Sequence, residues 1–334
     1  MRTLLLAAIS LLFALPGHAA DADRLVVYSA RSEPLIKPVF ERYTAETGVE
    51  IEFLTDKEAP LLARLQAEGQ RTPADILMTV DAGNLWQAAE QGVLAPLDSA
   101  ILEQNIPAHL RDAQGRWFGF SLRARTIIYN PGKVQPSELS TYAALAEPQW
   151  KGRVCLRTSK KVYNQSLIAA SIVERGAEAT EQMVRGWVAN LAADPFASDD
   201  EVINAVASGR CAVGIVNTYY FGRQQRTNPE IPVRLFWPDQ GEGRHGVHVN
   251  VSGAGMTRHA KHPEQARHFL EWLSSGEAQA MFASLNMEFP ANPAIESAPE
   301  VKAWGDFRAS DFPIADSGRL QAEAVALMDR AGYR

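Results

Sequence analysis

A repeated alternation of strand and helix patterns constrains the fold of this chain more than any other feature. In the first part of the sequence, short apolar runs predict three strands, and an amphipathic pattern after each of them predicts a helix. The strands are expected at residues 25–29, 49–54 and 75–79, and the helices at 34–46, 60–68 and from 82 to 92. This succession predicts a largely parallel sheet with helices on both faces.

The same alternation begins again after residue 125, which predicts a second α/β lobe. Strands are expected at residues 153–157 and 211–216, and helices at 163–175, 181–191, from Asp199 or Asp200 to Gly209, 263–273 and 277–285. Two extended stretches, 121–130 and 246–254, are rich in β-forming residues and lie between the two halves. We expect them to cross between the lobes as hinge strands. A chain of 334 residues is long for one core and sufficient for two domains.

The first twenty residues have the pattern of a signal peptide. Arg2 provides a positive charge, residues 4–15 are apolar, and small residues follow up to Ala20. Cleavage is expected after Ala19 or Ala20. The apolar run is too short for a permanent membrane helix, and no later segment is long and apolar enough for one. We therefore expect export to the periplasm.

The charged residues are dispersed, with 33 basic and 39 acidic side chains and a net charge of −6. Acidic and basic residues lie beside one another in the predicted helices. This pattern disfavours nucleic acid and an anionic membrane surface as partners.

The two cysteines, Cys155 and Cys211, each fall in a predicted strand. In an oxidising compartment such a pair favours a disulfide, provided that the two strands are neighbours. A thiol enzyme or a zinc site is the alternative, and no CxxC or Cys/His spacing supports it.

Three tyrosines follow predicted strands of the second half, at the strand ends where an α/β sheet binds its ligands. Tyr163 follows the first of these strands, and Tyr219 and Tyr220 follow the second, while Glu33 comes after the first strand of the other half. A phenol titrates at about pH 10 unless a cation stabilises its anion, and three phenolates balance the charge of ferric iron (Fe³⁺). The pattern therefore predicts a ferric-iron cleft. Ordinary packing of the tyrosine pair in a half-buried strand is the alternative.

A helix expected to begin near Ser159 offers free backbone N–H groups, and Lys160 and Lys161 add positive charge. Such a helix end suits a carbonate or phosphate that completes the coordination of iron. An ordinary N-cap serine with two solvated lysines is the alternative.

Seven segments, in order along the chain, resemble the periplasmic ferric-ion-binding proteins of ABC importers. They are residues 27–31 (VYSAR), 72–75 (TPAD), 79–83 (TVDAG), 150–154 (WKGRV), 163–167 (YNQSL), 217–220 (NTYY) and 251–255 (VSGAG). The resemblance implies a two-lobed, Venus-flytrap α/β fold with two crossing hinge strands and iron between the lobes. We expect the N-terminal lobe to comprise residues 21–123 and 250–292, and the C-terminal lobe residues 124–249 and 293–334.

The resemblance also implies roles for single residues. Tyr219 and Tyr220 match the family's paired tyrosine ligands, and Tyr163 matches a third tyrosine of its tyrosine-rich branch. Arg123 and Arg125 match basic residues near the cleft that support an anion or the phenolates.

The sequence departs from the family pattern on the N-terminal side of the cleft. Ser32 and Glu33 stand where many members carry a histidine, sometimes followed by tyrosine, and Val80 stands where others use a glutamate. Glu33, water or an anion is expected to fill the gap. Ser159 falls where other members bind a synergistic anion.

The function that these patterns favour is capture of ferric iron by a periplasmic monomer, with delivery to an inner-membrane ABC permease and its ATPase. A binding protein for another solute, such as a polyamine, a phosphonate or another anion, is the alternative. A secreted enzyme is disfavoured because the sequence contains no GxSxG, HExxH or P-loop pattern.

Overall fold

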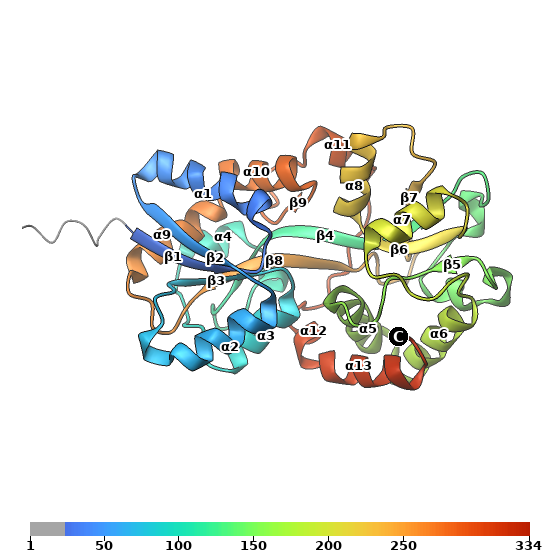
Figure 1. The fold of residues 1–334 in the computed structure, drawn as a ribbon, viewed down its shortest axis with the longest axis horizontal. Helices are drawn as coiled ribbons and strands as arrows, with labels where there is room; N and C mark the ends of the chain where they lie inside the picture. The colour runs from blue at the N-terminus through green and yellow to red at the C-terminus, as the bar shows by residue number, and fades with distance from the viewer. Residues whose placement is uncertain (1–23) are drawn as a thin grey trace, which may run out of the picture.

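In the computed structural model, which describes residues 24–334, the chain forms two lobes side by side, joined by two long strands (Figure 1). The predicted two-lobed α/β fold with crossing hinge strands is confirmed. The signal peptide expected at residues 1–20 lies outside the described residues. None of the helices within residues 24–334 is long and apolar enough to cross a bilayer.

The first lobe follows the predicted alternation closely. Gly48 ends the first helix with a φ of 78°, a left-handed conformation that glycine adopts without strain. The elements of this part of the chain are β1 (Arg24–Ser29), α1 (Glu33–Thr47), β2 (Glu50–Thr55), α2 (Glu58–Glu68), β3 (Ile76–Thr79), α3 (Ala82–Glu90) and α4 (Ala100–Asn105).

The second lobe begins after the first hinge strand, β4 (Phe118–Tyr129). Its elements are β5 (Val154–Cys155), α5 (Val162–Arg175), α6 (Ala177–Ala189), α7 (Asp199–Ala207), β6 (Val213–Asn217), α8 (Thr218–Thr227) and β7 (Arg234–Phe236). The expected cap of α7 is wrong by one residue, because Ser198 Oγ accepts the N–H of Glu201 at 3.2 Å. Asp199 is instead fully buried beneath the cleft.

The remaining elements begin with the second hinge strand and are divided between the lobes. They are β8 (Val249–Met256), α9 (Pro263–Leu273), α10 (Gly276–Asn286), β9 (Phe289–Pro290), α11 (Pro299–Lys302), α12 (Asp316–Arg319) and α13 (Gln321–Arg330). Short 3₁₀ turns lie at Gly69–Arg71, Ala108–Leu110, Pro136–Glu138, Ala143–Ala146 and Pro148–Trp150.

The strands form one mixed sheet in the order β2-β1-β3-β8-β4-β6-β5, and β7 and β9 also pair with β4. Pairing is parallel within each lobe, between β1 and its two neighbours and between β5 and β6. Every pair that includes β4 or β8 is antiparallel. The expectation of a largely parallel sheet is therefore wrong for the whole molecule, because the two hinge strands run against their neighbours.

The strand β4 changes its partner midway. It pairs with β8 as far as Ala124 opposite Val249, and with β6 from Arg125 opposite Asn217. One half of β4 thus belongs to each lobe, and the change of partner places the hinge between residues 124 and 125. This is the physical basis of the crossing strands predicted at 121–130 and 246–254.

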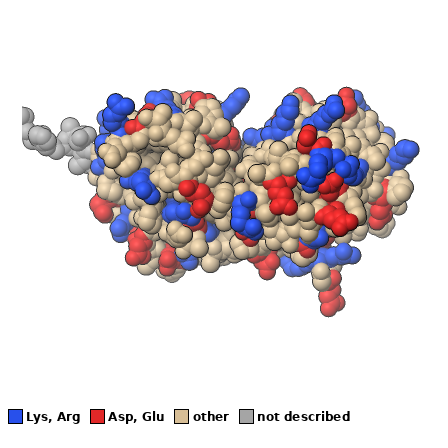
Figure 2. Space-filling model, turned by 90° about the horizontal axis from the view of Figure 1, so that it is seen from below, with Lys and Arg blue, Asp and Glu red and all other residues tan. Residues whose placement is uncertain are grey.

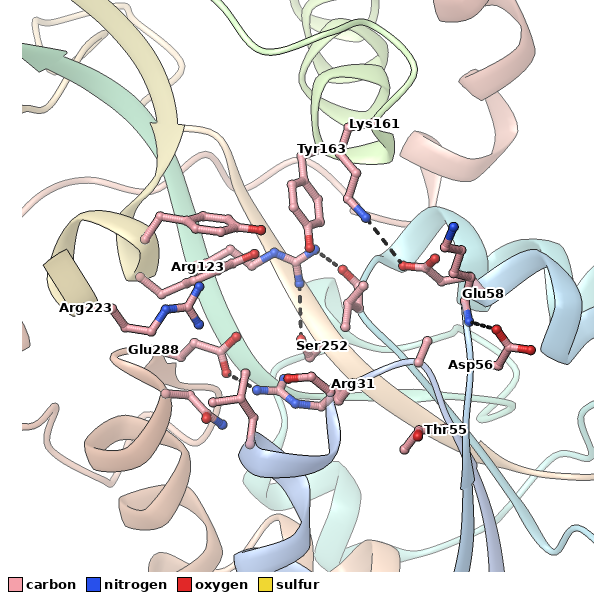
Figure 3. A pocket seen from close by; sticks show the side chains of 18 residues that line it. Arg31, Thr55, Asp56, Glu58, Arg123, Lys161, Tyr163, Arg223, Ser252 and Glu288 are labelled. Carbon is pink, nitrogen blue, oxygen red and sulfur yellow. Dashed lines mark hydrogen bonds and ion pairs between the residues drawn. The ribbon is translucent and has the colours of Figure 1, made fainter. Parts of the chain in front are cut away.

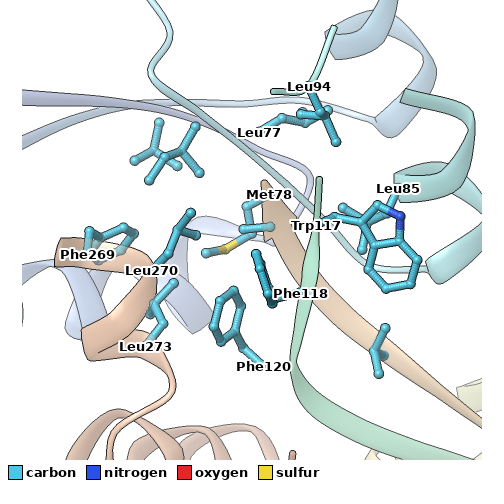
Figure 4. Close-up of a cluster of buried hydrophobic side chains, with 14 of the residues drawn as sticks. Leu77, Met78, Leu85, Leu94, Trp117, Phe118, Phe120, Phe269, Leu270 and Leu273 are labelled. Atoms are coloured by element: carbon cyan, nitrogen blue, oxygen red, sulfur yellow. The ribbon is translucent and has the colours of Figure 1, made fainter. Parts of the chain in front are cut away.

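Each lobe has its own buried apolar core. The first gathers side chains from distant segments, including Leu77, Trp117 and Phe269 (Figure 4). The second contains Trp150 and Trp187 together with residues of α13. The exact lobe limits remain a prediction. Residues 312–314 were expected in the C-terminal lobe, but Phe312 and Ile314 pack with the first core.

The predicted disulfide is confirmed. Cys155 at the end of β5 is bonded to Cys211, just before β6, with Cα atoms 5.9 Å apart. The parallel pairing of β5 and β6 brings the two cysteines together. The bond closes a loop that contains α5, α6 and α7. The disulfide is thus a structural link within the C-terminal lobe.

Candidate metal-binding cleft

A cavity of about 470 Å³ lies between the lobes and is lined from both of them (Figure 3). Its C-terminal wall carries Tyr163, Tyr219 and Tyr220, and the opposite wall includes Arg31 and Glu288. The space-filling view shows a notch in the outline where the two lobes meet, and acidic and basic side chains are mixed over the visible surface (Figure 2).

The three tyrosines leave from the first turns of two helices. Strand β6 ends at Asn217 and α8 starts at Thr218, so the backbone turns before Tyr219 and Tyr220 and brings both phenols to one side. Their ring centroids lie 4.5 Å apart. Tyr163 is the second residue of α5 and lines the same cavity. The structure thus brings together all three tyrosines that the sequence singled out.

The three phenols are close enough to influence one another's ionisation. Burial, and then the neighbouring Tyr220, raises the pKa of Tyr163 to about 12, while Arg123 acts in the opposite direction. Burial also raises the pKa of Tyr219 well above its usual value, and ionisation of Tyr163 or Tyr220 would raise it further. Without a bound cation the phenols of Tyr163 and Tyr219 are therefore neutral at pH 7, and a strong positive charge is needed to ionise them together.

Cationic side chains surround the three rings. Arg123 Cζ lies 5.4 Å and Lys161 Nζ 4.6 Å from the centroid of the Tyr163 ring. Arg223 Cζ lies 4.9 Å from the Tyr219 ring and 4.8 Å from that of Tyr220. Such cations attract the aromatic faces and also stabilise phenolate over phenol.

The two arginines predicted near the cleft occupy different positions. Arg123 lines the cavity, whereas Arg125 is buried behind it and is not among the lining residues. Arg125 Nη1 donates to Asp199 Oδ2 and to Asn217 Oδ1, both at 3.1 Å. Asn217 Nδ2 in turn donates to the Tyr219 hydroxyl at 3.4 Å. Arg125 therefore acts on the cleft through Asn217.

Two other predicted site residues do not line the cavity. Glu33 begins α1 with its side chain 53% exposed, 3.9 Å from Lys37. Ser32 and Leu35, on either side of it, do line the cavity. Ser159 lies before α5, which has Lys161 at its N-cap, and the Ser159 N–H donates to the Arg334 carbonyl at 3.2 Å. The helix expected near Ser159 begins three residues later.

The sequence reasoning missed the main groups of the N-terminal wall. Glu288 accepts hydrogen bonds from Arg31 Nη2 at 2.8 Å and from Ser121 Oγ at 2.9 Å, and all three residues are buried. Glu288 is 257 positions from Arg31 and 167 from Ser121, so no local pattern connects them. Arg223 was detectable, because it lies one helical turn after the tyrosine pair.

The donor set selects the class of metal. Phenol and carboxylate oxygens are hard ligands that suit a highly charged cation, and both cysteines are held in the disulfide. Within residues 24–334, no group of three or more His, Cys, Asp or Glu side chains is arranged to hold a metal. The three tyrosine hydroxyls are therefore the candidate metal ligands of this cleft.

Two α/β lobes, two hinge strands and a polar cavity between the lobes define a solute-binding protein of the Venus-flytrap class. Residues 39–309 match the family described as bacterial extracellular solute-binding protein. The chain belongs to this family, within its group of periplasmic ferric-ion-binding proteins.

Relatives and solved structures cover nearly the whole chain. It is 41% identical to "Iron uptake protein A1" of Synechocystis over 96% of this chain and 89% of the relative. A Trichodesmium protein solved in complex with iron and citrate ligands matches with a TM-score of 0.89 and 41% identity, over 93% of this chain and 100% of that one. A ferric binding protein from Campylobacter jejuni matches with a TM-score of 0.87 and 32% identity, over 93% and 100% respectively.

Proposed function

We propose that this chain captures ferric iron between its lobes and delivers it to an inner-membrane ABC permease with its ATPase. The observation that carries the proposal is the convergence of Tyr163, Tyr219 and Tyr220 on one cavity. The iron-related names of the relatives, and the iron and citrate in the Trichodesmium structure, support the same cargo. We assign the chain to the periplasm as a monomer, with the lobe limits given above.

In the proposed mechanism, iron binding releases protons from the tyrosine hydroxyls. Each phenol loses a proton as iron binds, and three phenolates balance the charge of Fe³⁺. Arg123 and Arg223, close to the rings, lower the cost of forming these anions. The lobes then close around the hinge between residues 124 and 125, which excludes water and presents one closed surface to the permease.

Ligands from outside the protein are expected to complete the shell on the N-terminal side. Glu288 reaches this side of the cavity, but one of its oxygens is already engaged by Arg31 and Ser121. A carbonate, a phosphate or a carboxylate such as citrate fits the cationic surroundings. Glu33 and Ser159 lie outside the cavity lining, and the proposal does not depend on them.

Another organic anion, such as a phosphonate, is the second candidate. Five cationic side chains line the cavity against three acidic ones, which favours anions over polyamines. The cationic residues are Arg31, Lys57, Arg123, Lys161 and Arg223. This candidate does not require the three tyrosines, whereas iron does.

The test is the visible absorption of the purified protein after addition of Fe³⁺ as its nitrilotriacetate complex. We expect a broad tyrosinate-to-iron band in the wild type and its loss in the Tyr219→Phe, Tyr220→Phe double variant. Tyr129→Phe is the matched control, because Tyr129 is a buried phenol at the far end of β4 in the C-terminal core. A colourless wild type, or a double variant that keeps its colour, would refute the proposal.

A further inference from the structure

The Asp81 carboxylate is fully buried beside the cleft, where the N-terminal lobe meets both hinge strands. It caps α3 by accepting the Gly83 N–H at 2.8 Å. Asn250 of β8 donates to its Oδ2 at 3.0 Å, and Arg123 of β4 approaches the same oxygen at 3.4 Å. Asp81 is thus fixed to the N-terminal side of the molecule and to the hinge.

One further bond to Asp81 comes from the opposite lobe. Ser166 Oγ donates to Asp81 Oδ1 at 2.9 Å, and Ser166 is only 1% exposed. Ser166 belongs to α5, which packs in the C-terminal core through Leu167 and Ile168, while Ala170 of the same helix joins the first core. This bond therefore joins the two lobes in the arrangement that the structure shows, and a movement of α5 away from Asp81 would break it.

The same group is connected to a tyrosine of the proposed site. Tyr163 and Ser166 are three residues apart on α5, so they lie on one face of the helix. Arg123, which approaches Asp81 and donates to the Val80 carbonyl, lies over the Tyr163 ring with its Cζ 5.4 Å from the centroid. The first turn of α5 is therefore held against the N-terminal lobe at both residues.

We propose that Asp81 and Ser166 are positioning residues that latch the lobes over the bound metal and hold Tyr163 in place. This inference rests on the proposed function, and it makes the rate of iron release depend on one buried hydrogen bond between the lobes.

A second contact crosses the cleft but is expected to matter less. Lys161 Nζ lies 3.8 Å from Glu58, with side chains 28% and 21% exposed, and Figure 3 shows the pair at the edge of the cavity. Solvent screens an ion pair of this kind, whereas a hydrogen bond to a buried carboxylate is not screened. We therefore attribute the latch to Ser166 and Asp81.

The test compares two serine variants of the same helix. Ser166→Ala removes the bond between the lobes, while Ser171→Ala removes a buried hydroxyl that only donates to the Leu167 carbonyl at 2.9 Å. Loss of the visible band after mixing with excess chelator measures iron release. We expect about tenfold faster release for Ser166→Ala, equivalent to about 1.4 kcal/mol, and a change of less than about twofold for Ser171→Ala.

A double-mutant cycle separates the latch from a general loss of stability. If Ser166 acts through Asp81, Ser166→Ala should add little to the release rate of Asp81→Ala, which leaves no acceptor at this position, although each variant alone speeds release. Equal release from Ser166→Ala and the wild type, or additive effects of the two changes, would overturn the inference while the band itself remained. Absence of the band from the wild type would instead overturn the proposed function, and the latch with it.

Discussion

The two walls of the cleft differ in how they keep buried polar groups. On the C-terminal wall, burial raises the pKa values of Tyr163 and Tyr219, so these two phenols carry no charge when the cargo is absent. On the N-terminal wall, basic and acidic side chains are already paired, Arg31 with Glu288 and Arg123 with Asp81. The first wall can therefore gain negative charge when a cation arrives, whereas the second already has its opposite charges paired with each other.

The largest expected effect is the pH dependence of iron binding, which belongs to the C-terminal wall. The pKa of Tyr163 is raised to about 12, so its phenol is protonated at neutral pH and must release its proton to bind iron. Affinity therefore falls as pH falls, by about tenfold per pH unit for each phenolate formed, or about a thousandfold for three.

Proton release in weakly buffered solution measures this directly. We expect about three protons per iron from the tyrosines of the wild type and about one fewer from Tyr163→Phe. The same number from both proteins would remove Tyr163 from the site. It would also remove the proposed difference between the walls.

A smaller effect concerns the stability of the N-terminal wall. The Arg31 and Glu288 side chains are only 3% and 5% exposed. Glu288→Ala leaves the Arg31 guanidinium buried without its partner, which is expected to lower the free energy of unfolding by about 3–5 kcal/mol. Glu52→Ala is the control, because its pair with Arg24 is exposed and contributes about 0–1 kcal/mol. Urea unfolding of the iron-free protein measures both, and equal losses would show that the Arg31–Glu288 pair does not support this wall.

The smallest expected effect is that of the exposed contact across the cleft. Glu58→Gln removes the ion pair with Lys161, which contributes about 0.2–1 kcal/mol. The substitution should therefore speed iron release by less than about fivefold at low salt. The difference should shrink at high ionic strength, because screening already weakens the pair in the wild type. Release more than about tenfold faster would make this pair, and not the buried Asp81–Ser166 bond, the main latch.

The sequence predicted the fold well where the signals were local. Helix and strand periodicities predicted most strands and the longer helices up to residue 285, although α8 and α13 were not predicted. The two cysteines in predicted strands indicated the disulfide that the structure contains. The prediction failed at helix starts, where one or two residues decide the outcome. Ser198 replaced Asp199 as the cap of α7, and α5 began at Val162, after Ser159.

The site residues that could be predicted from the sequence are those that come directly after a strand. Tyr163, Tyr219 and Tyr220 were found because loops after parallel strands meet at one edge of a sheet. Their role as iron ligands remains a prediction. Arg125 could not be separated from Arg123 in advance, since both point from β4 and only the surrounding packing places one in the cavity and the other behind it.

The sequence by itself determined the two-lobed α/β plan, the disulfide and the cluster of phenols, because each depends on short-range periodicity or on the position after a strand. Only the tertiary structure decided what faces the phenols. Arg31 and Glu288 meet across 257 positions, and Asp81 and Ser166 across 85, through the register of the hinge strands and the packing of whole lobes. Such contacts depend on how two cores sit against each other, and a pattern along the chain does not contain that information.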